Sequence, residues 1–97
     1  MLSYIVLASF TDQGIKTIKD STKRADAVKE TADRFGVKMR EIYWTQGQYD
    51  LVTLCDAQDE ASIAAFGLAV SSAGNVRFQT LRAFNRDEMN GILSKLP

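Results

Sequence analysis

The chain has 97 residues, with 12 basic and 12 acidic side chains, no histidine and one cysteine. The absence of histidine excludes Ser-His-Asp and Cys-His catalysis and imidazole metal ligands, and a single cysteine forms neither an internal disulfide nor a thiolate cage. The zero net charge argues against a nucleic-acid or anionic-membrane partner. We therefore expect one cytoplasmic domain over residues 1–97, with no cofactor, no metal site and no catalytic constellation.

The chain begins with a predicted strand and a predicted helix. β-Branched and aromatic side chains dominate residues 1–10, which is typical of a strand, and no targeting segment is expected there. Thr11 or Asp12 can cap the helix that follows, and Asp20 or Ser21 can start a second helical segment after a break. Gly36 is predicted to end the helix. The residues predicted to face the core are Ile15, Ile18, Ala25, Val28, Ala32 and Phe35.

An antiparallel hairpin is predicted next. Along residues 37–46 the side chains fall into two alternating sets, one for each face of a predicted strand, although neither set is purely polar. Residues 51–56 are almost continuously apolar, which is typical of a central strand covered on both faces. The short turn between the two strands predicts that they pair directly. Cys55 lies in the second of these strands and is predicted to be a small buried hydrophobe, because no histidine is present to activate its thiol.

The rest of the chain, from about residue 57, predicts a helix, a strand and a second helix. Acidic residues open the first helix near Asp59, small apolar residues continue it, and Gly74 follows its end. Residues 76–84 predict the fourth strand. A short amphipathic helix runs from Asn85 to about Lys95, and we expect it to dock on its own subunit or on a neighbouring one. Its apolar side chains are Met89, Ile92, Leu93 and Leu96.

The order β-α-β-β-α-β plus a terminal helix predicts an α+β, ferredoxin-like fold. Right-handed crossovers place both long helices on one face of a four-stranded antiparallel sheet. The other face would expose an apolar patch, which usually marks an interface. We therefore predict a homodimer through the sheet face, a dimeric α/β barrel, with higher homo-oligomers open; alternatively, some aromatic side chains lie at strand ends under the terminal helix. The candidates for this face are Tyr4, Val6, Ile42 or Tyr43, Trp44, Val52, Leu54 and Leu81.

The string from Tyr43 to Asp56 resembles the signature of the GYD domain family, which is named for a Gly-Tyr-Asp tripeptide between its second and third strands. Here the tripeptide reads Gln-Tyr-Asp over residues 48–50, with Gly47 one step earlier. The resemblance implies the dimeric α/β-barrel superfamily. It implies no particular chemistry, since members range from small monooxygenases and isomerases to ligand-sensing domains. Further similar segments are residues 10–14, 64–76 and 86–89.

Tyr49, Asp50 and Trp44 are the candidate ligand-binding residues, near the turn between the two middle strands. Tyr49 and Asp50 could form an acid–base or hydrogen-bonding pair at a cleft. Turn chemistry also explains them, and we favour it: Asp50 would bond to nearby backbone and Tyr49 would pack its ring over a helix. Trp44 could line an apolar pocket for a small aromatic ligand, or fill the dimer core.

Three strand arginines, at positions 40, 77 and 82, could bind a ligand carboxylate or pair with Glu41 and Asp56. We expect pairing between subunits, because an arginine at a sheet interface is hard to leave without a partner. The predicted function is an oligomeric protein that binds a small molecule near the turn. The alternatives are a cofactor-independent monooxygenase- or isomerase-like enzyme and a ligand-sensing regulatory module.

Overall fold

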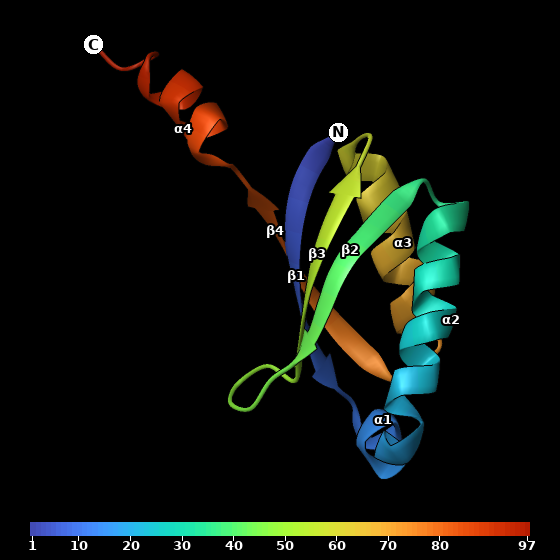
Figure 1. The fold of residues 1–97 in the computed structure, drawn as a ribbon. Coiled ribbons are helices and arrows are strands. Elements are labelled where there is room, and N and C mark those ends of the chain that lie inside the picture. Colours follow the sequence, from blue (N-terminus) through green and yellow to red (C-terminus); the bar gives the residue numbers. More distant parts are fainter.

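The computed structural model describes residues 1–97 and contains a four-stranded antiparallel sheet with the strand order β2-β3-β1-β4 (Figure 1). α2 and α3 cover one face of the sheet, whereas α4 stands away from the body (Figure 1). This arrangement confirms the predicted α+β, ferredoxin-like fold. None of the helices has the length and hydropathy that crossing a bilayer requires. The elements are β1 (Leu2–Phe10), α1 (Asp12–Lys16), a 3-10 turn η1 (Ile18–Asp20), α2 (Ser21–Arg34), β2 (Val37–Trp44), β3 (Leu51–Ala57), α3 (Glu60–Ser72), β4 (Val76–Ala83) and α4 (Arg86–Leu93).

Local chemistry sets the ends of the helices. The side chains of Thr11, Asp59 and Asn85 each accept a hydrogen bond from a backbone N–H in the first turn of α1, α3 and α4, respectively. Such caps satisfy N–H groups that have no partner inside the helix. Gly36 follows the end of α2 with a φ of 71°, a left-handed conformation that favours glycine. The predicted starts of these helices and the predicted end of α2 are therefore confirmed.

The first predicted helix is interrupted. α1 ends at Lys16 and α2 begins at Ser21, with η1 between them. The tighter turn shifts the helical phase. As a result, Ile15 and Ile18, which the spacing predicts to face the core, are exposed, whereas Ala32 of α2 is fully buried.

The core lies between the sheet and the helices and is built on alternate residues of the strands. Tyr4 and Val6 of β1 are buried there, and Tyr4 lies opposite Cys55 of β3. The prediction that Tyr4 and Val6 lie on the other face of the sheet is therefore wrong. β1 is apolar on both faces, so its alternation does not reveal which face the helices cover. Cys55 is fully buried, as predicted.

A β-bulge explains why neither face of β2 is polar. The register with β3 shifts between Met39 and Glu41, which leaves Arg40 without a paired residue. One extra residue reverses the alternation along a strand. Met39 before the bulge and Ile42 after it therefore both pack toward the helices, and the indole of Trp44 bonds to α2. Trp44 is thus on the helix side of the sheet, which corrects its predicted position.

The sheet face opposite the helices is apolar at its centre and uncovered, and we call it the open face. One row across it, from β2 to β4, is Glu41–Leu54–Ile5–Leu81, and the next row is Tyr43–Val52–Leu7–Gln79. Tyr43 and Leu81 expose 54% and 39% of their surface, and the four central apolar side chains are half-buried by their neighbours. β3 is central, as predicted. The apolar residues of the open face are Ile5, Leu7, Tyr43, Val52, Leu54 and Leu81.

Candidate functional site

Asp50 ties the β2–β3 turn to the end of β1. Its carboxylate Oδ2 accepts a hydrogen bond from the backbone N–H of Phe10 at 2.8 Å. Its backbone N–H donates to the carbonyl of Ala8, and its carbonyl accepts from the N–H of Thr45, both also at 2.8 Å. Three groups of one residue therefore hold the turn against β1 and close it on the residue that follows β2, which is the role that turn chemistry predicts.

Tyr49 lies at the rim of the open face. Its hydroxyl hydrogen-bonds to the side-chain carbonyl of Gln79 on β4. Its backbone carbonyl accepts a hydrogen bond of 2.6 Å from the hydroxyl of Thr45. Because Gln79 belongs to a row of the open face, the phenol of Tyr49 reaches across the end of that face and does not pack on a helix. This contact corrects the expectation that the Tyr49 ring covers a helix.

Trp44 lies on the opposite side of the sheet. Its indole N–H donates a hydrogen bond of 2.8 Å to the hydroxyl of Ser21, the first residue of α2. The three predicted site residues therefore come from one hairpin but lead to three places: Trp44 to α2, Tyr49 to the open face, and Asp50 to the backbone of β1. A ligand site that uses them stays a prediction.

A cavity of about 50 Å³ lies between the sheet and the two long helices. Its lining is mainly apolar, and it does not include Trp44, Tyr49 or Asp50. Polar side chains reach it from Ser21, Arg24 and Thr53 only. An engineered cavity that admits benzene is roughly 150 Å³, so this space is too small for an aromatic ring without rearrangement.

Arg24, at this cavity, already has partners for its guanidinium. It donates hydrogen bonds to the carbonyls of Thr17 at 2.8 Å and Gly14 at 3.0 Å. It also lies over the ring of Phe10, 6.0 Å from the ring centroid. Arg24 therefore braces the junction between α1 and α2, and a ligand carboxylate would have to displace these contacts.

The thiol of Cys55 has no sign of activation. Burial raises the pKa of Cys55, and the nearby Thr53 hydroxyl, 3.7 Å from the sulfur, only partly opposes that rise. A thiol with a raised pKa is a poor nucleophile at neutral pH, because the thiolate is the reactive species.

Two arginines of the strands pair within the chain. The Nε of Arg40, at the bulge, lies 2.8 Å from one carboxylate oxygen of Asp56, and the hydroxyl of Ser3 donates to the other oxygen at 3.2 Å. Arg82 bonds to Glu88. Within the single chain, Arg40 therefore pairs with Asp56 of β3, one of its expected partners, and Arg82 pairs with Glu88 of α4. Pairing of these arginines between subunits stays a prediction.

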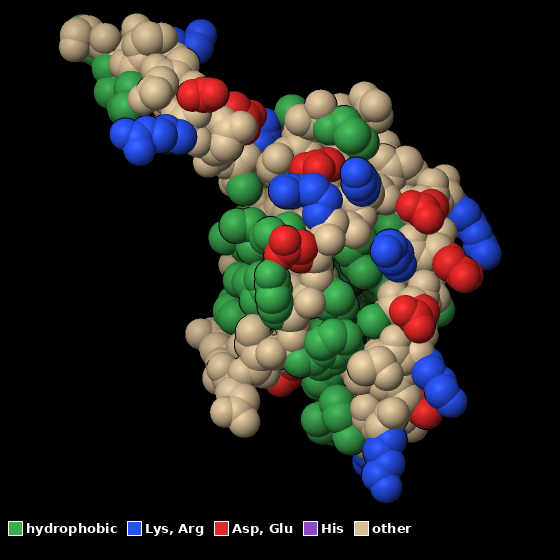
Figure 2. Space-filling view, in the orientation of Figure 1, with side chains coloured by type: hydrophobic (Ala, Val, Ile, Leu, Met, Phe, Trp, Pro, Cys, Tyr) green, Lys and Arg blue, Asp and Glu red, His purple; other side chains and the backbone are tan.

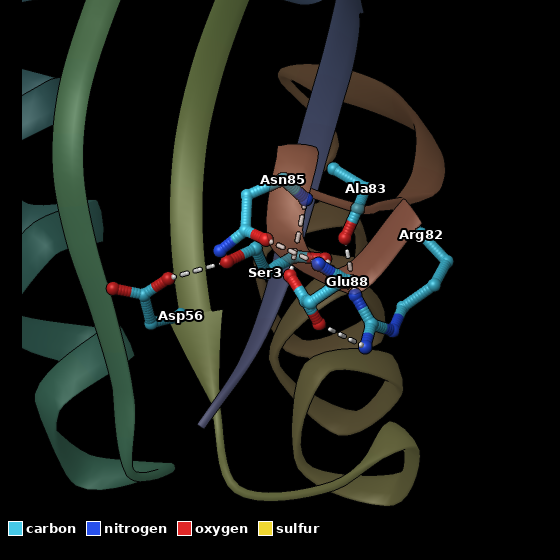
Figure 3. Close-up of polar contacts among 6 residues, drawn as sticks. All are labelled: Ser3, Asp56, Arg82, Ala83, Asn85 and Glu88. Atoms are coloured by element: carbon cyan, nitrogen blue, oxygen red, sulfur yellow. Dashed lines mark hydrogen bonds and ion pairs between the residues drawn. The ribbon is translucent and has the colours of Figure 1, made fainter. Parts of the chain in front are cut away.

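Arg82 forms the junction between the sheet and α4. Its guanidinium donates to the carbonyls of Ser3, at 3.1 Å, and Ala83, and it contacts the Glu88 carboxylate at 3.4 Å (Figure 3). Glu88 also accepts from the backbone N–H of Asn85 at 3.1 Å, which holds the pKa of Glu88 below its usual range. No spacing rule links Arg82 to Ser3, so only the fold reveals this cluster.

The strand order, with both long helices on one sheet face, defines an α+β domain of the ferredoxin-like class. Two solved structures of this class are from Mycobacterium tuberculosis: the leucine response regulatory protein (TM-score 0.65, 18% identity, 87% of this chain) and a feast or famine regulatory protein complexed with L-methionine (TM-score 0.66, 18% identity, 88% of this chain). This chain spans about half of each of those two chains, 51% in both cases. At this level of identity, the similarity between this chain and the two regulatory proteins concerns the fold alone.

Within that class the chain belongs to the GYD domain family, whose profile matches residues 4–93. A relative from Thermus thermophilus, the glutamine synthetase and cystathionine beta-lyase binding protein, is 36% identical over 84 residues, which is 86% of this chain and 88% of the relative. The solved structure of TTHA0845, also from Thermus thermophilus, has a TM-score of 0.57 and 25% identity, and the match covers 88% of this chain and 95% of that one. The resemblance to the family is thereby confirmed.

Proposed function

We propose that this protein is a homodimeric binding protein, in which two copies pack open face against open face and the dimer binds other proteins. The observation that carries the proposal is the open face itself, an apolar surface without a cover in the single chain. Burial of apolar surface is the main driving force of association. Two sheets pack in this way by interdigitating side chains across about 10 Å.

The open face is organised like an interface. Leu54, Ile5, Val52 and Leu7 form its centre, and each row has one polar or charged end, Glu41 in the first and Gln79 in the second. An apolar centre within a polar rim is the usual anatomy of a protein–protein contact. A two-fold axis through the centre would place the same patch on both subunits, which is the commonest arrangement in homodimers.

The partner class is suggested by the relative from Thermus thermophilus, which is named as binding glutamine synthetase and cystathionine beta-lyase. We extend this to enzymes of amino-acid metabolism as partners of the present chain. In the dimer the outer surface of α2 and α3 would remain free for such a partner. Its exposed basic side chains include Lys23 and Lys29. The buried free thiol of Cys55 fits a cytoplasmic location, where thiols stay reduced.

Analytical ultracentrifugation at micromolar concentrations tests the homodimer. We expect the wild-type chain to sediment as a dimer and Leu54→Glu to sediment as a monomer, because the variant would bury a charge at the centre of the interface. The control is Leu68→Glu, since Leu68 is largely exposed on α3, away from the open face. A folded wild-type monomer would refute the homodimer.

The partner class is tested by interferometry, which measures binding of the protein to purified glutamine synthetase and to purified cystathionine beta-lyase. Serum albumin provides the control surface. We expect saturable binding to at least one of the two enzymes and a weakened response for the double variant Lys23→Glu, Lys29→Glu. Binding to neither enzyme would refute the partner class and leave the ultracentrifugation result standing.

We also propose a narrower role for the β2–β3 turn, a small-molecule site at the rim of the open face. It is supported by Tyr49 and Gln79, whose polar groups meet at that rim. Trp44 and Asp50 lie outside it. A thermal-shift screen with amino acids and aromatic acids should give a rise in melting temperature that Tyr49→Phe reduces. No rise with any of these compounds would count against the site.

A further inference from the structure

The N-terminus of α4 is fixed by its own side chains. Asn85 and Glu88 form a capping box: the side chain of Asn85 accepts from the N–H of Glu88 at 2.8 Å, and the carboxylate of Glu88 accepts from the N–H of Asn85 at 3.1 Å. Arg82 joins this box to the start of β1 through the carbonyl of Ser3 (Figure 3). The direction in which α4 leaves the sheet is therefore set by a network of hydrogen bonds.

The apolar side of α4 has no cover. α4 makes no extensive contact with any other helix or strand and stands apart from the body (Figure 1). An isolated helix of this length is marginal in water, because its nucleation cost is not repaid without packing. The exposed apolar side chains of α4 and of the residues on either side of it, which expose between 36% and 66% of their surface, are Phe84, Met89, Ile92, Leu93 and Leu96.

We propose that α4 is an arm that packs its apolar side on the second copy in the dimer; this inference rests on the proposed function and adds to it a second contact region. The two regions are continuous in the chain. Leu81 of β4 belongs to the open face, and Phe84 lies in the short segment between β4 and α4. Figure 2 shows hydrophobic side chains gathered over the strands between α4 and the β2–β3 turn.

The exposed area matches what a dimer needs. The accessible surface of the chain is 6617 Å², roughly 1,100 Å² more than the roughly 5,500 Å² expected of a compact protein of this mass. A standard interface buries about 800 Å² on each partner. The radius of gyration, 14.6 Å, likewise exceeds the roughly 12.5 Å expected for this length. One copy thus carries an excess of surface of the size that a second copy would cover.

The charges of α4 favour a protein surface over a lipid surface. Arg86 and Lys95 are balanced by Asp87 and Glu88. Helices that lie on anionic membranes carry an excess of Lys and Arg on their polar side, which α4 lacks. A second copy also offers, by symmetry, a reciprocal arm, so that each subunit would give and receive the same contact.

Ultracentrifugation of α4 variants tests the arm. We expect the double variant Ile92→Asp, Leu93→Asp to raise the dimer dissociation constant about tenfold or more, since it places charges in an apolar contact. The matched control is Asn90→Asp, which adds a charge to the polar side of the same helix and should leave the constant unchanged. Because α4 contacts its own chain mainly through Arg82 and Glu88, and Ile92 and Leu93 take no part in that contact, the body of the double variant should keep its wild-type circular dichroism and melting temperature.

Photo-crosslinking identifies what the arm contacts. A benzophenone amino acid replaces Ile92 or, as the control, Asn90, in a mixture of ¹⁴N- and ¹⁵N-labelled protein. We expect position 92, and not position 90, to give mixed-isotope crosslinked dimers. An unchanged dissociation constant together with only intrachain crosslinks would refute the arm, while the loss of the dimer in Leu54→Glu would still support the open face. Sedimentation of the wild-type chain with anionic vesicles, without intermolecular crosslinks, would also refute the arm.

Discussion

The carboxylate of Asp50 accepts a hydrogen bond from the backbone N–H of Phe10, 40 residues earlier in the chain, at 2.8 Å. The contact joins the turn between β2 and β3 to the last residue of β1. It gives the aspartate of the Gln-Tyr-Asp string a role in the fold, independent of any ligand. Hydrogen bonds to a charged group contribute more than neutral ones, so this contact is a strong local restraint.

Asp50→Ala should lower the free energy of unfolding by about 1–3 kcal/mol, because the N–H of Phe10 loses its acceptor. Asp50→Asn keeps an acceptor oxygen at the same place and should cost less. Urea denaturation of the two variants measures the difference. Equal stabilities of Asp50→Ala and the wild-type chain would show that water replaces the carboxylate without cost.

Gly14 lies in α1, against the turn between α3 and β4. A Cβ at this position would lie 2.0 Å from the backbone carbonyl oxygen of Asn75, which cannot move without displacing the α3–β4 turn. Gly14→Ala should therefore destabilise the chain by about 2–4 kcal/mol. The control is Gly91→Ala, because Gly91 lies within α4 with open space around it. That change should be neutral or stabilise α4 by up to about 1 kcal/mol. A Gly14→Ala chain as stable as Gly91→Ala would contradict the close contact.

The hydrogen bond between the indole of Trp44 and the hydroxyl of Ser21 connects β2 to α2. Trp44→Phe and Ser21→Ala should each destabilise the protein, and the double variant should cost less than the two single changes added together. The expected coupling energy is about 0.5–1.5 kcal/mol. Thermal and urea unfolding of the four proteins in the cycle measures it. Strict additivity would show that the two side chains do not interact in solution.

Glu88 should make α4 sensitive to acid. The backbone N–H of Asn85 lowers the pKa of Glu88 in the folded state below the value of about 4.3 that an unfolded chain has. The contribution of Glu88 to the stability of α4 is therefore fully present above about pH 4.3 and is lost as the pH falls through the lowered folded pKa. Because α4 packs on no other element of its chain, the loss should appear in the amide signals of α4 before the body of the protein unfolds.

Nuclear magnetic resonance titration of the α4 amides, in the monomeric Leu54→Glu background, measures this effect. Glu88→Gln serves as the control, since it removes the titrating group and should abolish the acid-dependent step in α4. An acid step that persists in Glu88→Gln would assign the effect to another group.

Much of the local structure follows from residues close together in the chain. Thr11, Asp59 and Asn85 are each predicted at or near a helix start, and all three cap a helix. Gly36 ends α2 as its position indicates. These features depend on hydrogen bonds within about four residues, which is why local spacing predicts them.

The placement of side chains on the two sheet faces is predictable only in part. Tyr43 lies on the open face, as one of the two options at that point, but Trp44 does not. The reason is the bulge at Arg40, which reverses the alternation of β2. In the sequence it shows only as two faces of mixed polarity, which do not reveal where the alternation reverses. The candidate site divides for the same reason, since Trp44 and Tyr49 lie on opposite sides of one sheet.

Composition and short-range contacts were enough to establish the type and order of the elements, the helix caps and the absence of histidine chemistry. Folding in three dimensions settled which face of each strand is buried, how Arg40 and Arg82 are paired, and that α4 leaves the body with its apolar side uncovered. Those features depend on contacts between residues far apart in the chain, such as Ser3 with Arg82, and no local pattern encodes such a contact. The open face and α4 carry the exposed apolar surface on which the proposed dimer rests.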